Sequence, residues 1–183
     1  MNRIQKLSRF LKRVFWVIFF GWPICLILIW FGDQQNGFLA QMGFSIKTFI
    51  PNNSLPILVP LSMATKIEGF VLSFIPMGLS MAIAYFCTRL FSCYEKGEVF
   101  TIKSIQYIKK IGILMIVWAI LNPFYQLAMS LILTIHNPVG HRVLALGVGS
   151  GYVRNLIMAG LVFLIAYIMQ EALKLHEDQS LTV

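Results

Sequence analysis

Long apolar runs without a charged residue constrain this chain more than any other feature of its sequence. Three such runs cover residues 14–31, 69–88 and 111–135. About 20 helical residues, at about 1.5 Å each, cross the roughly 30 Å hydrocarbon core of a bilayer. Apolar residues make up 58% of the chain and charged residues only 12%, whereas soluble domains are about 25% charged. We therefore expect an all-α, polytopic membrane protein.

A fourth apolar run is shorter and covers residues 156–169. Extending it back to 152 restores a spanning length, because Arg154 can extend its charged head to the interface. We expect one domain, 1–183, with four spans in a bundle at about 14–31, 69–88, 111–135 and 152–169. The first run is long for a signal-peptide core and no small-x-small site follows it, which favours a retained span.

The remaining segments are two outer loops at 32–68 and 136–151, an inner loop at 89–110 and tails at 1–13 and 170–183. Lys and Arg in short loops stay on the cytoplasmic side. The N-terminal tail carries five of them, the inner loop five and the C-terminal tail one, whereas the opposite side carries Lys47, Lys66, Arg142 and Arg154. We expect both termini in the cytoplasm and the protein in a bacterial inner membrane.

The N-terminal tail has the pattern of a basic amphipathic helix. Ile4, Leu7, Leu11 and Val14 recur at steps of three and four residues, a spacing that places them on one side of a helix. We expect this lead-in to lie on anionic lipid. The predicted membrane-surface bases are Arg3, Lys6, Arg9, Lys12 and Arg13. Since bases gather at the ends of apolar runs, the net charge of +8 indicates membrane orientation, and we expect no direct binding of nucleic acid.

The inner loop is predicted to turn at Gly97 and to begin a helix at Ile102 with Thr101 as N-cap. Ile102, Ile105 and Ile108 would then face apolar surface, in an amphipathic stretch before the third span. A plainer interpretation is that the third span begins early, at the membrane surface. The predicted partner-binding residues are Tyr94, Lys96, Lys103, Lys109 and Lys110 in the loop, with Leu181 and Val183 at the end of the chain.

Polar and small residues inside the spans predict packing. Asn122 and Gln126 lie one turn apart on the third span, which favours hydrogen bonds across the bundle over contact with a substrate or ion.

Other residues in the spans predict the shape and packing of the helices. Pro76 and Pro123 should bend their spans. The pairs Gly69 with Ser73 and Gly78 with Ala82 should let helices approach, within the fold or in a homodimer. Trp16 and Trp30 should mark the two interfaces of the first span.

Catalytic motifs are absent from the sequence, and no Asp or Glu lies inside a span, so we expect no enzyme, no cofactor and no metal. His136 and His141 share a loop without Cys, Asp or Glu to complete a metal site, and they are expected to be exposed. Cys25, Cys87 and Cys93 lack Cys-x-x-Cys spacing and are expected to be unpaired thiols.

The loop at residues 90–112 resembles that of a known family. It contains Tyr94, Gly97, Phe100, Thr101 and Gly112, and the chain ends in Leu-Thr-Val at 181–183. With four spans in this order, the chain resembles the bacterial membrane proteins catalogued as domain of unknown function 2975. It differs from the family's usual loop at Ser104-Ile105, where an Asn-Val pair is expected. The resemblance implies the topology above and, from neighbouring genes, a small helix-turn-helix regulator as a candidate partner.

Two functional hypotheses follow. The first is a non-enzymatic scaffold or regulator that binds a cytosolic protein through the lead-in, the inner loop and the tail, since these features share one face. The alternative is a small transporter or channel with a path lined by Asn122 and Gln126, opened by bends at the two prolines. Loss of partner capture on changing the loop or tail tests the first, and flux in liposomes tests the second.

Overall fold

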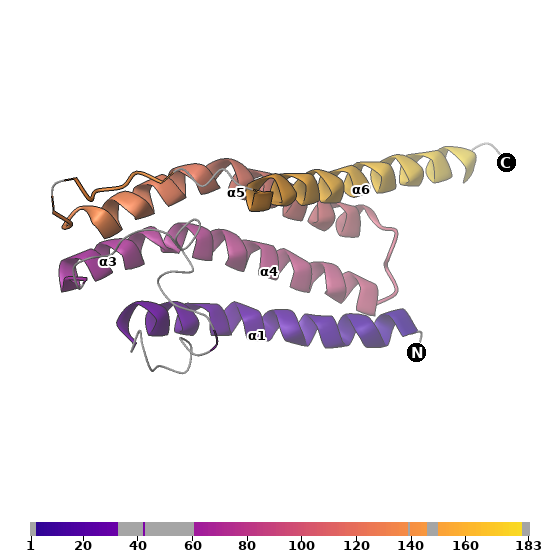
Figure 1. Ribbon diagram of the computed structural model, residues 1–183. Helices are drawn as coiled ribbons and strands as arrows, with labels where there is room; N and C mark the ends of the chain where they lie inside the picture. Colours follow the sequence, from indigo (N-terminus) through magenta and orange to yellow (C-terminus); the bar gives the residue numbers. More distant parts are fainter. Residues whose placement is uncertain (1–2, 33–41, 43–60, 139, 146–149, 181–183) are drawn as a thin grey trace. The chain divides into compact units, whose positions relative to one another are not determined.

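All regular secondary structure in the described part of the chain is helical (Figure 1). The computed structural model describes residues 3–32, 42, 61–138, 140–145 and 150–180. The helices are α1 (Arg3–Phe31), α3 (Met63–Leu72), α4 (Phe74–Glu95), α5 (Ile102–Thr134) and α6 (Ser150–Ser180). The all-α class predicted from the apolar runs is confirmed.

Four helical segments are long and apolar enough to cross a membrane. They are Ile4–Phe31, Met63–Glu95, Ile102–Thr134 and Gly151–Leu175. Each contains one of the four predicted spans or most of it, including the fourth, whose helix begins before Arg154. The chain is therefore a multi-pass membrane protein with four candidate spans.

The second span is interrupted at Ser73, between α3 and α4. Ser62 caps α3, since its hydroxyl accepts a hydrogen bond from the Thr65 backbone N–H at 3.2 Å. Pro76 lies in the first turn of α4, where its missing N–H leaves the Leu72 carbonyl without the usual partner. The predicted disturbance by Pro76 thus falls before the proline, at Ser73. In α5 the helix continues through Pro123 without interruption.

The connection between α4 and α5 is shorter than the predicted inner loop, because α4 continues to Glu95 and α5 begins at Ile102. Gly97 adopts a φ of +85°, which confirms the predicted turn. Thr101 and Ser104 form a reciprocal cap: the Ser104 N–H donates to the Thr101 hydroxyl at 3.3 Å, and the Thr101 N–H donates to the Ser104 hydroxyl at 3.2 Å. Thr101 is therefore the N-cap of α5, as predicted. From Thr101, α5 continues into the third span as one helix.

The chain forms two compact units. Unit 1 comprises Met1–Phe20, Leu79–Ala119 and Val153–Val183. Its core joins α4, α5 and α6 through the buried side chains of Leu90, Ile108, Ile111 and Ala166. Figure 1 shows α1 beside α4 in this unit, where Phe15 stacks on Phe91 with ring centroids 5.7 Å apart. All four membrane helices thus contribute to unit 1.

Gly112 is the point of close approach between α5 and α6 in unit 1. A Cβ placed on it would lie 3.1 Å from the backbone N and Cα of Phe163. Backbone atoms cannot rotate away, so only glycine fits there without a shift of one helix. Gly112 was singled out from the sequence by family resemblance, and this contact gives a physical reason for it.

Unit 2 comprises Gly21–Gly78 and Ile120–Tyr152. Within it the Trp30 indole packs on Gly69, and its Nε1 donates to the Ser73 hydroxyl at 3.1 Å. The Gly69 and Ser73 pair therefore serves packing within the fold, as predicted, whereas a Cβ on Gly78 would meet no atom within 4 Å. The Trp30 indole is fully buried, so it packs within the fold. That Trp30 marks a membrane interface stays a prediction.

The described ends of the chain are helical, as predicted for the N-terminal lead-in but not for the C-terminal tail. α1 begins at Arg3 and enters the first span without a break, and α6 continues to Ser180. Ile4 and Leu7 are 56% and 60% exposed, whereas Leu11 and Val14 are half-buried, so only the first part of the apolar side is uncovered in unit 1. Whether this segment lies on lipid stays a prediction.

Candidate functional site

Two bases of α1 pair with the last residue of α4. Arg9 Nε donates to Glu95 Oε1 at 2.9 Å, and Lys12 Nζ donates to Glu95 Oε2 at 3.2 Å. The Glu95 side chain is 25% exposed, so the pairs are partly shielded from water. Both bases were predicted to contact the membrane surface, and the structure assigns them a second role in joining α1 to α4.

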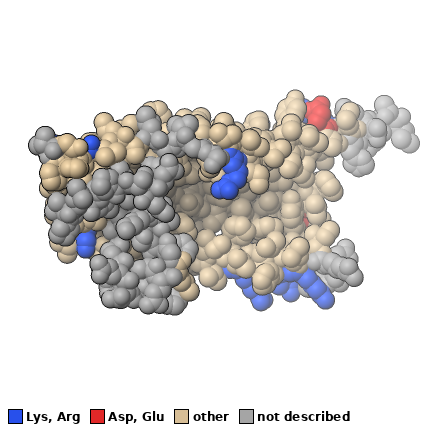
Figure 2. All heavy atoms as spheres, viewed as in Figure 1, with Lys and Arg blue, Asp and Glu red and all other residues tan. Residues whose placement is uncertain are grey.

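The other predicted surface bases of α1 point outward. Lys6 and Arg13 are exposed, and Figure 2 shows Lys and Arg gathered over the first turns of α1. Of Arg3, only the backbone is described. This part of α1 therefore carries several cations. Among the described residues, its ion pairs are formed with a single carboxylate, that of Glu95 on α4.

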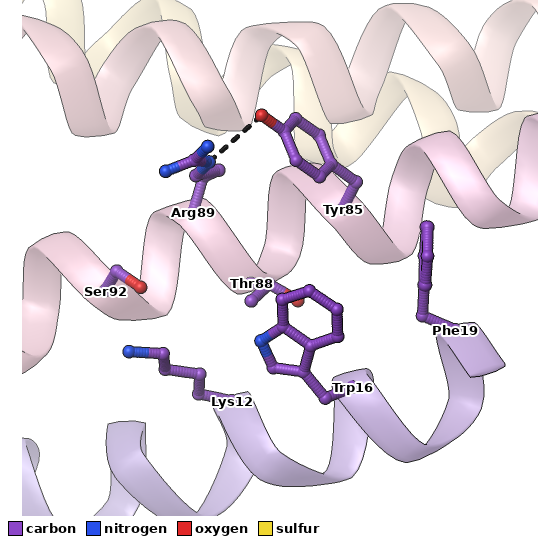
Figure 3. Close-up of a pocket in the computed structure, with 7 residues that line it drawn as sticks. All are labelled: Lys12, Trp16, Phe19, Tyr85, Thr88, Arg89 and Ser92. Carbon is purple, nitrogen blue, oxygen red and sulfur yellow. Dashed lines mark hydrogen bonds between the residues drawn. The ribbon is translucent and has the colours of Figure 1, made fainter.

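A cavity of about 280 Å³ lies between α1 and α4 in unit 1, and we call it the α1–α4 cavity. Its walls combine cations, aromatic rings and hydroxyls (Figure 3). Helix α1 contributes Lys12, Trp16 and Phe19, and helix α4 contributes Tyr85, Thr88, Arg89 and Ser92. Lys12 and Trp16 were predicted to lie at the membrane surface. The other five residues were not predicted, because they come together only when two distant segments pack.

Arg89 is held by Tyr85 on one face of α4, as the dashed line in Figure 3 marks. Its Nε donates to the Tyr85 hydroxyl at 3.0 Å, and its guanidinium lies 5.2 Å from the centre of that ring. No carboxylate among the described residues forms an ion pair with Arg89. The terminal guanidinium nitrogens are therefore oriented and available to an anion.

Four lysines predicted to bind a partner are exposed, namely Lys96, Lys103, Lys109 and Lys110. The Lys110 ammonium lies 5.3 Å from the centre of the Phe86 ring. Tyr94 differs from the others, because it is partly buried and packs against the core of unit 1. Its ring contributes to the fold, and its contact with a partner stays a prediction.

A second cavity, of about 290 Å³, lies between the beginning of α5 and the end of α6, and we call it the α5–α6 groove. Apolar and polar side chains alternate around it: Ile102, Ile105, Gln106, Lys109, Gln170, Leu173 and Lys174. Ile105 is buried and Ile102 is 58% exposed, so the predicted apolar side of this stretch is only partly covered. Of the predicted partner-binding residues that the structure describes, Lys109 alone lines the groove.

The intramembrane amides pair with each other. Gln126 Nε2 donates to Asn122 Oδ1 within α5, so the hydrogen bond described here joins two turns of one helix. A hydrogen bond across the bundle stays a prediction. Gln126 Oε1 is buried and has no hydrogen-bond partner among the described residues. The pair therefore leaves one buried acceptor in unit 2.

The described part of the chain contains no group of three His, Cys, Asp or Glu side chains that could hold a metal ion. His136 and His141 are exposed, as predicted, and His136 Nδ1 lies 3.3 Å from the Thr65 hydroxyl. The three cysteines are free thiols. Leu181 and Val183 lie outside the described residues.

Comparison with known proteins identifies one family. The family model described as "Protein of unknown function (DUF2975)" matches residues 19–183, which include the end of α1 and all of α3, α4, α5 and α6. Residues 1–18, with Arg9, Lys12 and Trp16, precede the match. No curated protein and no solved structure is significantly similar to the chain.

Proposed function

Because this chain belongs to the DUF2975 family of proteins of unknown function, we propose its role from its own surfaces: a non-enzymatic scaffold of the bacterial inner membrane that binds a cytosolic regulatory protein. The observation that carries this proposal is the α5–α6 groove. It places two lysines and two glutamines around apolar side chains, at the ends of two membrane helices.

An acidic, amphipathic segment of a partner suits this groove. Its apolar side would cover Ile102 and Leu173, and its carboxylates would accept hydrogen bonds from Lys109 and Lys174. Lys174 also lies 3.5 Å from Glu171, but both side chains are more than half exposed, so this pair is weak. Lys96 and Lys103 would steer an acidic partner to the same region.

The orientation with both termini in the cytoplasm is part of this proposal. The ion pairs of Glu95 bring the beginning of α1 to the end of α4, and the groove brings the beginning of α5 to the end of α6. These are the helix ends that the distribution of Lys and Arg assigns to the cytoplasm. A small helix-turn-helix regulator is the candidate partner that the family resemblance implies.

The test is co-purification of the full chain with that regulator after co-expression. Lys109→Glu with Lys174→Glu should lower capture by about tenfold or more, since a charge-assisted hydrogen bond contributes about 1.5–3 kcal/mol and tenfold is about 1.4 kcal/mol. Lys66→Glu with Arg142→Glu makes the same change of charge away from the groove and should leave capture unchanged. Equal capture by both double variants would contradict the proposal. Deleting residues 177–183 tests the contribution of the tail.

A transport function is the second candidate, and the buried Gln126 Oε1 favours it. A buried acceptor without a described partner suits a passing solute or ion. Flux through liposomes containing the purified chain should then fall when Asn122→Leu and Gln126→Leu are combined. Flux that does not respond to these changes, or no flux at all, removes this candidate.

A further inference from the structure

We propose that the α1–α4 cavity binds the phosphate headgroup of an anionic phospholipid. This site is separate from the α5–α6 groove and does not depend on the proposed partner. The cavity has the three components that such a headgroup needs: cations for the phosphate, a hydroxyl donor, and aromatic rings for the glycerol and acyl region.

The depth of the cavity in the membrane follows from the sequence. Lys12 comes just before the uncharged run 14–31, and Arg89 comes just after the uncharged run 69–88. Both runs belong to candidate spans, so both cations lie where hydrocarbon gives way to headgroups. A soluble anion would have to leave water to reach this depth, whereas a phospholipid phosphate is already there.

The charge of the site favours an anion. Arg9 and Lys12 share the single carboxylate of Glu95, and Arg89 has no carboxylate partner among the described residues. The cavity is thus lined by two cations, Lys12 and Arg89, and by no carboxylate among the described residues. The Tyr85 hydroxyl fixes the Nε side of Arg89, which leaves the terminal nitrogens for bidentate contact with phosphate oxygens.

The two aliphatic hydroxyls of α4 that line the cavity, those of Thr88 and Ser92, differ in their hydrogen bonds. The Thr88 hydroxyl donates to the Ala84 carbonyl at 2.8 Å, so it is already used within α4. The Ser92 hydroxyl forms no hydrogen bond with any described residue and lines the cavity, which leaves it free to donate to a phosphate oxygen.

The aromatic wall continues onto the surface of α1. Trp16 stacks on Phe20 at 5.3 Å between ring centroids, and Phe20 and Val17 are 62% and 72% exposed. An acyl chain can follow this apolar surface away from the headgroup. The volume of about 280 Å³ is near the lower limit for small-molecule sites, roughly 300 Å³, and therefore suits a headgroup rather than a whole lipid.

Native mass spectrometry of the purified full chain tests the proposal, with phosphatidylglycerol, phosphatidylcholine and inorganic phosphate as the three probes. The chain should prefer phosphatidylglycerol over phosphatidylcholine by about tenfold, the effect of one charge-assisted contact. Inorganic phosphate should not displace the bound lipid. Displacement by phosphate would overturn the proposal in favour of a soluble phosphate site.

The variants are matched in charge. Lys12→Gln with Arg89→Gln should abolish the preference, whereas Arg9→Gln with Arg13→Gln removes two charges and one Glu95 ion pair outside the cavity and should preserve it. Equal loss in both double variants would mean non-specific attraction and would overturn the proposal.

A single variant tests the geometry of the contact. Arg89→Lys keeps the charge but loses the bidentate geometry, so a several-fold loss of preference is expected even if the first double variant does not fold. An unchanged preference in Arg89→Lys would also overturn it.

Discussion

The indole of Trp30 and the hydroxyl of Ser73 form a buried hydrogen bond of 3.1 Å in unit 2. The Ser73 hydroxyl also donates to the Gly69 carbonyl at 2.7 Å, so it is both donor and acceptor. The indole lies over Gly69, where a Cβ would overlap its six-membered ring. This contact joins the end of the first span to α3.

Gly69→Ala should therefore destabilise the protein by about 1–3 kcal/mol, the usual cost of adding atoms to a packed interior. The measurement is the midpoint of thermal unfolding in detergent. Gly78→Ala is the matched control, since a Cβ there meets nothing within 4 Å, and it should be neutral or stabilise α4 by about 0.5–1 kcal/mol. Equal midpoints for the two variants would refute the role of Gly69.

Gly112→Ala should destabilise unit 1, because the new Cβ would press on the Phe163 backbone at 3.1 Å. A cost of about 1–3 kcal/mol is expected. Gly160→Ala on α6 provides the comparison, since no atom lies within 4 Å of its added Cβ and alanine favours a helix. The two variants should shift the unfolding midpoint in opposite directions, and a shift in the same direction would contradict the close approach.

Thr101→Ala should weaken the start of α5 by about 0.5–2 kcal/mol, because the Ser104 N–H loses its side-chain acceptor. Hydrogen exchange at the Ser104 amide should become faster. Thr101→Ser retains the hydroxyl and should exchange like the unchanged protein. No change in Thr101→Ala would mean that the cap does not fix the beginning of the helix.

Glu95→Gln should lower stability slightly at low salt, since it removes the charge that pairs with Arg9 and Lys12. The difference should shrink at high salt, because exposed ion pairs are screened. Glu98→Gln serves as the control, as Glu98 is exposed and forms no ion pair with the described residues. A loss in Glu95→Gln that does not depend on salt would contradict an electrostatic contact.

Features that depend on local sequence were predictable. The four candidate spans follow from hydropathy alone, because each needs only its own apolar residues. The turn at Gly97 and the cap at Thr101 are also local, and the structure confirms both. Ser104 completes that cap with its own hydroxyl. The predicted family is confirmed over residues 19–183.

Features that depend on pairing between distant segments were not predictable. Arg9 and Glu95 are 86 positions apart, and the charges alone do not reveal which base meets which acid. Trp30 has the residue type and position of an interfacial tryptophan, and only the Gly69 surface explains its burial. The α1–α4 cavity combines side chains of two helices, none of which forms a motif in its own segment.

Access of a membrane-impermeant maleimide to single cysteines tests the central claim most directly, namely that the basic helix ends of unit 1 face the cytoplasm. Cys25, Cys87 and Cys93 are first replaced by serine, and Lys103→Cys and Arg142→Cys are compared, since both positions are exposed. In intact cells the cysteine at position 142 should react, and the one at position 103 should react only after the membrane is permeabilised. Reaction at position 103 in intact cells would contradict the account.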